Sequence, residues 1–367
     1  MRSVMAHQFS QIPRAEIQRS SFNRSHGYKT TFDSGYLVPF YIDEVLPGDT
    51  FNLKCTLFAR LATPIVPFMD NMFMETFFFF VPNRLLWDNW QKFNGEQENP
   101  GDSTDFLVPT IKNTGSFTVG GIADYFGIPT GVNNLEVNAL PFRAYNLIYN
   151  EWFRDENLQD SLPVEKGDGP DDVADYKLVR RGKRHDYFTS ALPWPQKGPG
   201  VEIPLGTSAP VLSTKSVSTN YLTPDSGYRG SVIVQSGHMN INNPTGGGAN
   251  IDIGMKLDDF GLYADLTTAT AYTINSLRQA FQVQRLYERD ARGGTRYTEI
   301  LRAHFGVVSP DARLQRPEYL GGSSSPININ PVQQTSATDS TSPQGNLAAF
   351  GLTSSKIHGF TKSFVEH

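Results

Sequence analysis

FNLKCTLFARL, residues 51–61, alternates between apolar and polar side chains. The odd positions from Phe51 to Leu61 are apolar, and the even positions are polar except for Phe58. Because successive side chains of a strand point to opposite faces, this period of two predicts a β-strand with one mostly wet face. The tetrapeptide LPGD, which ends at Asp49, has the composition of a turn and stands just before this strand.

A second segment, MFMETFFFFV at residues 72–81, is apolar at almost every position and is followed by Pro82. Such a run predicts a strand that is covered on both faces, and a proline, which lacks an N–H, ends it. A row of consecutive phenylalanines on an open sheet edge would promote aggregation. We therefore expect these side chains to be hidden in a sandwich core or under a neighbouring subunit.

The composition of the 367 residues favours the same class of fold. Aromatic residues make up 12% of the chain, which also contains 32 Gly and 24 Pro. Many aromatics, frequent turn residues and short apolar runs are typical of a mainly β protein with long loops. The length suffices for one large domain or two medium ones.

Three segments have a helical period. In residues 141–157, aromatic and aliphatic side chains recur every three or four positions. Residues 271–291 form a second predicted helix, and two consecutive glycines separate it from a third that begins near Thr295. Gly306 stands where the C-cap of this third helix is expected.

Two polar stretches predict surface loops. Residues 198–254 are dominated by Ser, Thr, Asn, Gly and Pro, with a strand-like fragment at 231–235. Residues 321–345 have a similar composition and lead to the same prediction. At the other extreme, residues 356–367 have the pattern of a strand that begins just before the chain stops, so we expect an incomplete sheet.

The sequence contains no motif that carries catalytic or metal chemistry. Its seven histidines are scattered, with no H-x-x-x-H or H-E-x-x-H pair, and no acidic loop has EF-hand spacing. A G-x-x-x-x-G-K-[ST] phosphate loop and a G-x-S-x-G elbow are also missing. His185, Asp186 and Ser190 are the residue types of a catalytic triad, but adjacency in sequence is not triad geometry. We expect no catalytic residue, no metal site and no cofactor.

Cysteine usage and hydropathy argue against two further classes of protein, those held by disulfides or cysteine-bound zinc and those inserted in a membrane. Cys55 is the single cysteine, so an intramolecular disulfide and a cysteine-based zinc site are impossible. No apolar run approaches the ~20 residues that span a bilayer. The first residues lack the continuous apolar segment of a signal peptide. We therefore expect no membrane insertion.

The net charge is −5, so any contact with nucleic acid must come from a local patch. Residues 1–35 supply one such patch, a polar segment without a sustained period whose cations include Arg14, Arg19 and Arg24. A solvated terminus and a basic arm that meets phosphate both fit this composition. We interpret residues 1–35 as an extended basic arm.

Two further basic features are candidate contact sites. Residues 180–184 place four cations in five positions, namely Arg180, Arg181, Lys183 and Arg184. In the second predicted helix, arginines recur at helical spacing as a stripe opposite the apolar one, at Arg278, Arg285, Arg289 and Arg292. This stripe suits contact with phosphate or with another subunit, but pairing with the nearby Glu288 and Asp290 explains it equally well.

Five long, collinear blocks resemble one known family. They are FNRSHGYKTTFDSGYLVPFYIDEVLPGDTF from Phe22, FARLATPIVPFMDNMFMETFFFFVPNRLLWDNW from Phe58, PFRAYNLIYNEWFRDENLQ from Pro141, RGKRHDYFTSALPWPQKGP from Arg181, and QRLYERDARGGTRYTEILRAHFGVVSPDARLQRPEYLGG from Gln284. All of them resemble segments of the major capsid proteins of gokushoviruses, a branch of the microviruses, which are small single-stranded DNA bacteriophages. The blocks cover much of the chain, so the match is more specific than a short motif.

The resemblance implies an eight-stranded antiparallel jelly roll with long insertions, a single domain at residues 36–367 behind the arm. It implies a T=1 icosahedral shell of pentamers around a circular single-stranded DNA genome, with other virion proteins as partners. The insertion at about residues 198–254 would meet a receptor on the host surface. Such a protein is made in the bacterial cytoplasm and becomes part of the virion. Capsid proteins of this type continue past the equivalent of His367, so strands of the jelly roll are expected to be missing.

The resemblance also makes the basic residues candidate genome contacts. The candidates for nucleic-acid binding are Arg14, Arg19, Arg24, Arg180, Arg181, Lys183 and Arg184, and the helical stripe is assigned to either DNA or a subunit interface. The alternative is a carbohydrate-binding β-sandwich of a phage spike or lectin type, since jelly rolls serve many functions. That alternative predicts an exposed aromatic platform and gives no reason for a basic arm.

Overall fold

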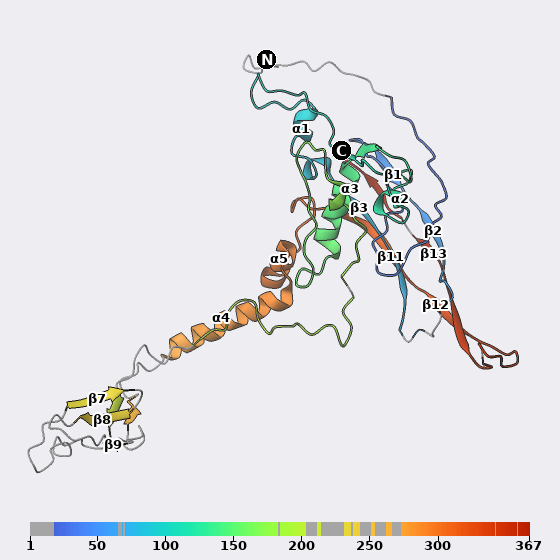
Figure 1. The fold of residues 1–367 in the computed structure, drawn as a ribbon. Coiled ribbons are helices and arrows are strands. Elements are labelled where there is room, and N and C mark those ends of the chain that lie inside the picture. Colours follow the sequence, from blue (N-terminus) through green and yellow to red (C-terminus); the bar gives the residue numbers. More distant parts are fainter. Residues whose placement is uncertain are drawn as a thin grey trace, which may run out of the picture. The chain divides into compact units, whose positions relative to one another are not determined.

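The computed structural model describes residues 18–64, 68, 70–182, 184–202, 211–213, 231–235, 238–242, 251–253, 262–265, 273–341, 343–357 and 359–367. The chain forms two compact units. The first, which we call the sheet unit, comprises Met1–Arg184 and Ser309–His367. The second, which we call the helical unit, comprises His185–Val308. Figure 1 shows the elements of both units in sequence colours.

The sheet unit is built from antiparallel ladders. Its strands are β1 (Thr50–Asn52), β2 (Cys55–Arg60), β3 (Phe73–Phe80), β4 (Thr110–Lys112), β5 (Glu136–Asn138), β11 (Glu318–Pro326), β12 (Asn328–Gln333), β13 (Leu347–Ile357) and β14 (Thr361–Ser363). β3 pairs with β11, β13 lies between β12 and β2, β1 pairs with β14, and β4 pairs with β5. All of these strand pairs are antiparallel. The mainly β fold is thereby confirmed, whereas the number of eight jelly-roll strands stays a prediction.

The alternating segment 51–61 forms β1 and β2, as its period predicted. The odd positions of β2 are half-buried, and the even positions are exposed. Phe58, the apolar exception, lies on the wet face with 72% of its surface exposed. The turn before β1 is also confirmed, because the Asp49 N–H donates to the carbonyl of Leu46 at 3.0 Å and Gly48 has a φ of 88°.

The phenylalanine-rich segment forms β3, and the strand stops two residues before Pro82. Its rings are covered on both faces of the strand by other aromatic side chains. On one face, Phe77 and Phe79 have ring centroids 5.0 and 5.8 Å from that of Phe153. On the other face, the Phe78 centroid lies 5.7 Å from that of Phe360. The sheet unit itself therefore supplies much of the cover that the sequence demanded.

The polar stretch 321–345 was wrongly predicted to be a surface loop. Its first half forms most of β11 and all of β12, which pair with β3 and β13. Gly321 and Gly322 of β11 lie opposite Phe78 and Phe77 of β3, and the serines that follow lie opposite Thr76, Glu75 and Met74. A Cβ on Gly322 would overlap the carbonyl of Thr76, so a small residue is required there. Composition predicted a loop because it does not report which strand lies alongside.

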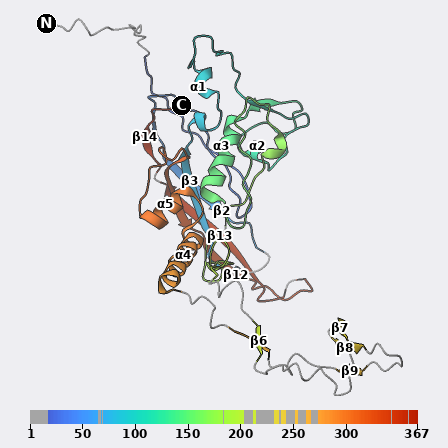
Figure 2. The same cartoon turned by 90° about the vertical axis from the view of Figure 1, so that its left-hand side faces the viewer.

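Short helices complete the sheet unit. They are α1 (Trp90–Phe93), α2 (Ile122–Tyr125) and α3 (Leu140–Ile148), which continues as a π-helical turn at Tyr149–Phe153, with 3₁₀ turns at Asn83–Leu85 and Val173–Asp175. Figure 2 shows α2 and α3 near each other in the sheet unit. Ile122 of α2 and Phe142 of α3 belong to one buried cluster with Ile111 of β4. The helix predicted at 141–157 ends earlier, because Arg154 adopts extended backbone angles.

The helical unit contains the other two predicted helices, α4 (Ile274–Gly293) and α5 (Tyr297–Phe305). Thr273 caps α4, since its hydroxyl accepts a hydrogen bond from the Ser276 N–H at 3.1 Å. Gly294 has a φ of 90° and ends α4, and Gly306 has a φ of 67° and caps α5. Glycine adopts these angles without a steric penalty, which explains why the sequence signals held.

In the part of the sequence that precedes α4 and follows Arg184, the described residues include five short strands. β6 (Val211–Ser213) pairs with β10 (Leu262–Ala264), and β7 (Ser231–Gln235), β8 (His238–Asn242) and β9 (Ile251–Ile253) form an antiparallel sheet. β7 confirms the strand-like fragment of the sequence. The β6–β10 pair brings the two ends of the intervening segment together. Most of the predicted insertion 198–254 lies outside the described residues.

Candidate functional site

The basic run 180–184 converges on one carboxylate of β3. Arg184 Nη2 lies 2.8 Å from Glu75 Oε1, and Arg181 Nη1 forms an ion pair with the other oxygen, Glu75 Oε2. Arg180 takes another partner, and its guanidinium carbon lies 4.7 Å above the ring centre of Tyr36. Lys183 lies outside the described residues. Glu75 therefore orients two cations of the run without neutralising all of it.

Aromatic rings of β3 support the same two guanidinium groups. Arg181 lies 5.7 Å from the ring centre of Phe77 and 5.6 Å from that of Phe153, and Arg184 lies 5.0 Å from that of Phe73. Arginine above an aromatic face gains cation–π attraction. The side chain of Arg181 is 29% exposed and that of Arg184 is 55% exposed. Arg181 is thus mainly a packing residue, while Arg184 still presents donors to solvent.

The described part of the basic arm is held by ion pairs with the segment before β1. Arg19 Nη1 lies 3.1 Å from Asp49 Oδ1, and its Nη2 donates to the carbonyl of Pro47 at 2.8 Å. Arg24 Nη1 lies 2.5 Å from Asp43 Oδ1. Both arginines are exposed, so each pair contributes only about 0–1 kcal/mol to stability. Arg14 lies outside the described residues.

Tyrosines fix the next part of this N-terminal segment against the helices. The Tyr28 hydroxyl donates to the Tyr125 carbonyl at 3.2 Å, and the Tyr125 hydroxyl donates to the Thr31 carbonyl at 2.9 Å. The Tyr145 hydroxyl of α3 donates to the Leu37 carbonyl at 2.8 Å. Burial is the main cause that raises the pKa of Tyr145 to about 12. The segment is therefore extended, yet attached at specific points.

The arginine stripe of α4 is exposed along its whole length. Arg278, Arg285, Arg289 and Arg292 all lie on the solvent side. Pairing with nearby carboxylates, the alternative that the sequence left open, is found for one of the four arginines among the described residues. Arg292 approaches Glu288 at 3.9 Å, whereas Asp290 is engaged by His304, whose Nε2 lies 2.5 Å from its Oδ1. The other three arginines form no ion pair with a described carboxylate.

The apolar stripe of α4 does not lie opposite these arginines, contrary to the prediction. Ile274 is 70% exposed and Phe281 is 60% exposed. At about 100° per residue, both fall within the same sector of the helix as the arginines. The side that packs instead carries Ala291, which is buried. The sequence pattern misled because spacings of three and four residues place Phe281 beside both Arg278 and Arg285.

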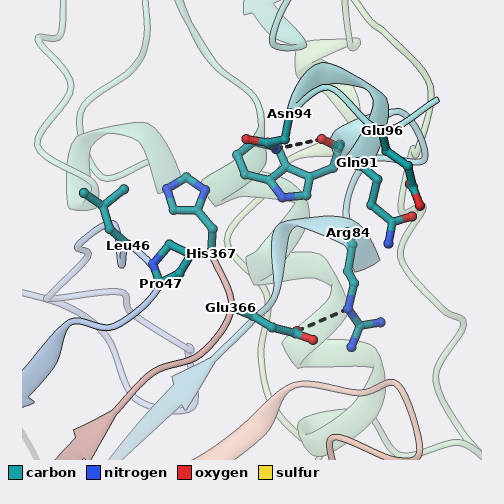
Figure 3. A pocket seen from close by; sticks show the side chains of 9 residues that line it. Leu46, Pro47, Arg84, Gln91, Asn94, Glu96, Glu366 and His367 are labelled. Carbon is teal, nitrogen blue, oxygen red and sulfur yellow. Dashed lines mark hydrogen bonds and ion pairs between the residues drawn. The ribbon is translucent and has the colours of Figure 1, made fainter. Parts of the chain in front are cut away.

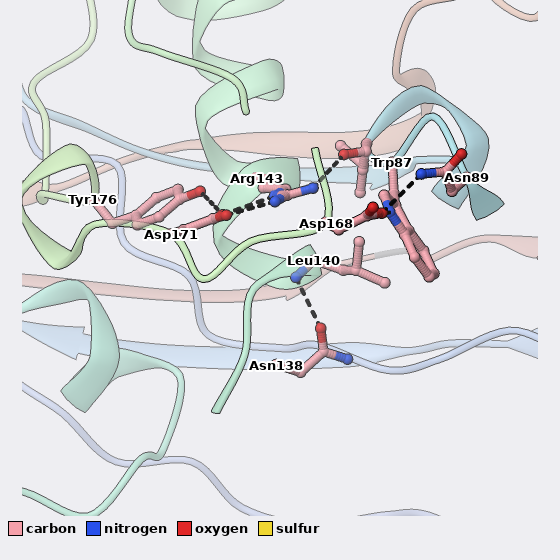
Figure 4. A network of polar contacts seen from close by, with 9 residues as sticks. Trp87, Asn89, Asn138, Leu140, Arg143, Asp168, Asp171 and Tyr176 are labelled. Carbon is pink, nitrogen blue, oxygen red and sulfur yellow. Dashed lines mark hydrogen bonds and ion pairs between the residues drawn. The ribbon is translucent and has the colours of Figure 1, made fainter. Parts of the chain in front are cut away.

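A buried polar network that the sequence did not reveal holds the centre of the sheet unit (Figure 4). Arg143 donates from Nε and Nη2 to Asp171 at 2.7 and 2.5 Å, and from Nη1 to the carbonyl of Leu86 at 3.0 Å. The Tyr176 hydroxyl donates to the same carboxylate at 2.5 Å. At about 100° per residue, Arg143 lies on the side of the helix opposite the stripe of Tyr145 and Tyr149, so the helical period gave no signal of this network.

A second carboxylate in this region, Asp168, accepts from Trp87 Nε1 at 2.7 Å and from Asn89 Nδ2 at 2.8 Å (Figure 4). The hydrogen bonds from Asn89 and Trp87 lower the pKa of Asp168, because they favour its charged form. Both donors come from the segment just before and at the start of α1. Together, Asp168 and Asp171 fasten one loop to two separate parts of the sheet unit.

An open hollow of about 550 Å³ lies between α1 and the last residues of the chain (Figure 3). The imidazole of His367 stacks on Trp90 with ring centroids 4.8 Å apart, and Arg84 Nε lies 3.1 Å from Glu366 Oε2. The lining residues are Leu46, Pro47, Arg84, Trp90, Gln91, Asn94, Glu96, Glu366 and His367. Their charged groups pair with one another or face solvent, and they do not converge on a common point.

The residues with triad chemistry are engaged in a local turn. The Asp186 carboxylate accepts from the backbone N–H groups of Phe188 and Thr189 at 2.9 and 2.8 Å, and His185 Nδ1 contacts the Thr189 carbonyl at 3.2 Å. The described residues contain no group of three potential metal ligands. Burial raises the pKa of the Cys55 thiol, which disfavours its reactive thiolate.

Antiparallel ladders, a phenylalanine-rich strand covered by aromatic rings and exposed cations are the features of a mainly β structural protein. Comparison with known proteins gives this class its family. Residues 10–367 match the model of the capsid protein (F protein) family, and the chain belongs to that family. The resemblance to capsid proteins of gokushovirus-type microviruses is thereby confirmed.

Three relatives are each called capsid protein VP1. That of Bdellovibrio phage phiMH2K is 54% identical over 98% of this chain and 69% of its own length. That of Chlamydia phage 1 is 46% identical over 100% of this chain and 72% of its own length. That of Spiroplasma virus 4 is 38% identical over 100% of this chain and 70% of its own length.

The chain is therefore a component of the virion, and it assembles with other copies into a capsid that contains a packaged genome. This role is structural. Among the helices that the structure describes, none is long and apolar enough to cross a membrane.

Proposed function

We propose that the chain is the subunit of a T=1 icosahedral shell, built from pentamers, which encloses a circular single-stranded DNA genome. Other virion proteins complete the particle, and the subunit itself has no catalytic function. The observation that carries this proposal is the collinear match to phage capsid proteins over almost the whole chain. We further propose that residues 1–35 act as a basic arm and that residues 36–367 form the jelly-roll domain of the shell wall.

The sheet unit supports this role because its sheets and aromatic contacts make a rigid wall element. Phe80 packs on Phe364 with ring centroids 4.7 Å apart, and Trp152 donates from Nε1 to the Pro317 carbonyl at 3.0 Å. Edge-to-face and tilted aromatic pairs add about 0.5–1.5 kcal/mol each beyond the area that they bury. A wall held in this way can transmit the forces of a closed shell without unfolding.

Cryo-electron microscopy of purified particles that contain this chain tests the shell. A reconstruction with T=1 icosahedral symmetry and five copies around each fivefold axis is the expected result. The nucleic acid extracted from the particles should be degraded by a single-strand-specific nuclease and by DNase, and should resist exonuclease because it is circular. A helical assembly, a larger triangulation number or a double-stranded genome would contradict the proposal.

The segment between β6 and β10 is proposed to be the host-attachment insertion. Support comes from the antiparallel pairing of Ser213 with Leu262, which places the two ends of the segment side by side. A segment whose ends meet can be lengthened or replaced without strain on the rest of the fold. It also has the Gly-, Ser- and Thr-rich composition of surface loops.

Replacing residues 214–261 with a short Gly-Ser linker tests this assignment, because the linker only has to join Ser213 to Leu262. We expect particles of normal symmetry that adsorb to host cells at least ~10-fold less well, which corresponds to the loss of about 1.4 kcal/mol of attachment free energy. A matched control inserts the same linker into the turn after β12, at Asp339. Unchanged adsorption of well-formed particles would exclude the insertion as the attachment site.

The basic run 180–184 is proposed to contact the genome through its exposed members. Two of the four cations of the run pair with one carboxylate, Glu75, so a net positive charge remains. Cations and aromatic rings together are the usual means of holding single strands without sequence preference. Since Arg181 packs against Phe77 and Phe153, the described member of the run best exposed to meet phosphate is Arg184, and the proposal includes its sequence neighbour Lys183 as a further cation.

Reversing the charge at Lys183 and Arg184 (Lys183→Glu with Arg184→Glu) tests this contact. We expect particles that package less DNA per capsid, measured as the ratio of ultraviolet absorbance by nucleic acid to that by protein. Arg313→Glu is a matched control, because Arg313 is also exposed and forms no ion pair with a described residue. DNA content equal to that of the control would exclude a genome-binding role for the run.

A further inference from the structure

The arginine face of α4 carries both charge and exposed apolar surface. Arg278 and Arg285 flank Phe281 at spacings of three and four residues, so the three side chains are neighbours on the helix. Phe281 is 60% exposed, and Leu286, one residue beyond Arg285, is 47% exposed. A helix face that mixes unpaired arginines with exposed apolar side chains is typical of a protein interface, where arginine and aromatic residues are enriched.

Little within the helical unit neutralises this face among the described residues. Glu288 lies 3.9 Å from Arg292, while Asp290 contacts His304 and Glu299 contacts Arg296. Arg278, Arg285 and Arg289 form no ion pair with any described side chain. The partner must therefore supply negative charge, and it must also supply apolar surface to cover Phe281 and Ile274.

The sheet unit presents a surface with the matching chemistry on the loop that follows α1. Residues 93–107 contain four acidic residues and no basic one. Glu96, Glu98 and Asp105 are exposed, and none of them pairs with a described cation. Asp102 is used by the loop itself, because its Oδ2 accepts from the Asn99 N–H at 2.9 Å.

This acidic loop also exposes apolar side chains. Leu107 is 86% exposed, and Phe93 at the start of the loop is 38% exposed. The loop thus carries three exposed carboxylates and the exposed Leu107, and the arginine face carries three exposed arginines and the exposed Phe281, so the two surfaces are opposite in charge and both include apolar surface. Opposed charges of this kind specify a partner and its register more than they add affinity.

We propose that the arginine face of α4 in one copy docks on the acidic loop 93–107 of a second copy in the capsid. Two arginine faces would repel each other, so the contact joins two different surfaces, as in a heterologous interface that closes into a ring. A protein partner fits better than nucleic acid, because aliphatic residues such as Ile274 and Leu286 cannot stack on bases. The inference depends on the proposed shell function only because the contact requires several copies of the chain in one assembly.

Cross-linking between two distinguishable chains is the direct test. In a Cys55→Ser background, one tagged chain carries Arg285→Cys and an untagged chain carries Glu98→Cys, and the two are mixed and treated with a short bismaleimide. We expect tagged–untagged dimers at least ~10-fold more abundant than in a control mixture of Arg313→Cys with Asp160→Cys, a factor that 1.4 kcal/mol of contact free energy would give. Arg313 and Asp160 are also exposed and lie outside both surfaces.

Charge reversal supplies the second readout. Arg285→Glu alone should abolish the cross-link between copies, tested with thiols at Arg289→Cys and, in the partner chain, at the exposed Thr104→Cys, and Glu98→Arg in the partner chain should restore it. A link confined to single chains that carry both cysteines would show that the face is covered by its own chain and would overturn the proposal. Loss of the link on adding a single-stranded oligonucleotide, with weaker oligonucleotide binding by Arg285→Glu, would assign the face to nucleic acid and overturn it too. A cross-link yield equal to that of the control mixture would also overturn the proposal, but it would not contradict the capsid function.

Discussion

Arg143 and Asp171 form a two-point ion pair inside the sheet unit, and their side chains are 0% and 2% exposed. Burial of an ion pair is costly, and the cost is offset only when every donor and acceptor is satisfied. Here the Leu86 carbonyl accepts a hydrogen bond from Arg143, and the Tyr176 hydroxyl donates one to Asp171. The pair joins α3 to the loop that precedes Tyr176 and so fixes the position of both.

Removal of one partner should leave the other charge buried and alone. We expect Arg143→Met to lower the free energy of unfolding by about 3–5 kcal/mol. The measurement is urea unfolding followed by the fluorescence of the four tryptophans. Arg302→Met is the matched control, because Arg302 is exposed on α5, and it should change the free energy by less than about 0.5 kcal/mol.

A triple variant separates the ion pair from packing. Arg143→Met, Asp171→Leu and Tyr176→Phe together remove every charged or hydroxyl member of the network. This variant should be more stable than Arg143→Met alone, since no charge is left unpaired. If Arg143→Met unfolded at the wild-type urea concentration, the pair would carry no stability and this explanation of the loop would fail.

Gly322 of β11 should not tolerate a side chain. A Cβ at this position would meet the carbonyl of Thr76 and, at 2.8 Å, the hydroxyl of Tyr319. Because a backbone carbonyl in a ladder cannot move aside, Gly322→Ala should cost about 1–3 kcal/mol of folding free energy. Gly27→Ala is the control, since a Cβ at Gly27 would meet nothing within 4 Å. Equal urea midpoints for the two variants would mean that β11 does not pair with β3 as described.

Sequence alone predicted the elements whose signal is local. The period of two in residues 51–61 and the phenylalanine run gave β2 and β3, because a strand's side chains alternate whatever lies beside it. Residues 274–293 and 297–305 gave α4 and α5, because Gly294 and Gly306 interrupt and end the helical pattern. The family could be recognised for another reason, because a match over several long blocks in the same order is far less expected by chance than a match to a short motif.

The candidate site depended on partners far away in the sequence, and these could not be predicted. Glu75 and Arg181 are separated by 106 positions, so the run 180–184 looked like a free cationic patch. Residues 321–333 looked like a loop because glycine and serine are turn formers, but β3 and β13 offer ladders to this stretch, and the close approach of the Thr76 carbonyl requires a glycine at position 322. Pairing of this kind is a property of the folded chain and leaves no local period.

The tyrosine that attaches the N-terminal segment to α3 should make stability depend on alkaline pH. The folded pKa of Tyr145 is raised to about 12, against about 10 in an unfolded chain. A raised pKa means that the contribution is fully present below pH ~10 and is lost as pH rises towards ~12, because the unfolded chain releases the proton first. We expect about 2–3 kcal/mol to disappear across this window, an order-of-magnitude value.

Tyr145→Phe isolates this contribution, because phenylalanine cannot ionise. The variant should lose about 1 kcal/mol near neutral pH, where its hydrogen bond to the Leu37 carbonyl is missing. Between pH ~10 and ~12 its stability should fall less steeply than that of the wild type. Urea midpoints measured across the range give both values. Parallel curves for the two proteins would show that Tyr145 ionises as freely when folded as when unfolded.

Glu75 of β3 forms ion pairs with Arg181 and Arg184. Glu75→Gln removes one negative charge from beneath the basic run and leaves its cations in place. Single-stranded oligonucleotides should then bind more tightly, and the slope of log K against log salt should steepen by up to about 0.7 for each additional phosphate neutralised. Fluorescence anisotropy across a salt series measures this slope. Glu165→Gln, at an exposed carboxylate elsewhere, should leave it unchanged. A Glu75→Gln slope equal to that of this control would mean that the cations of residues 180–184 serve the fold and do not contact the genome.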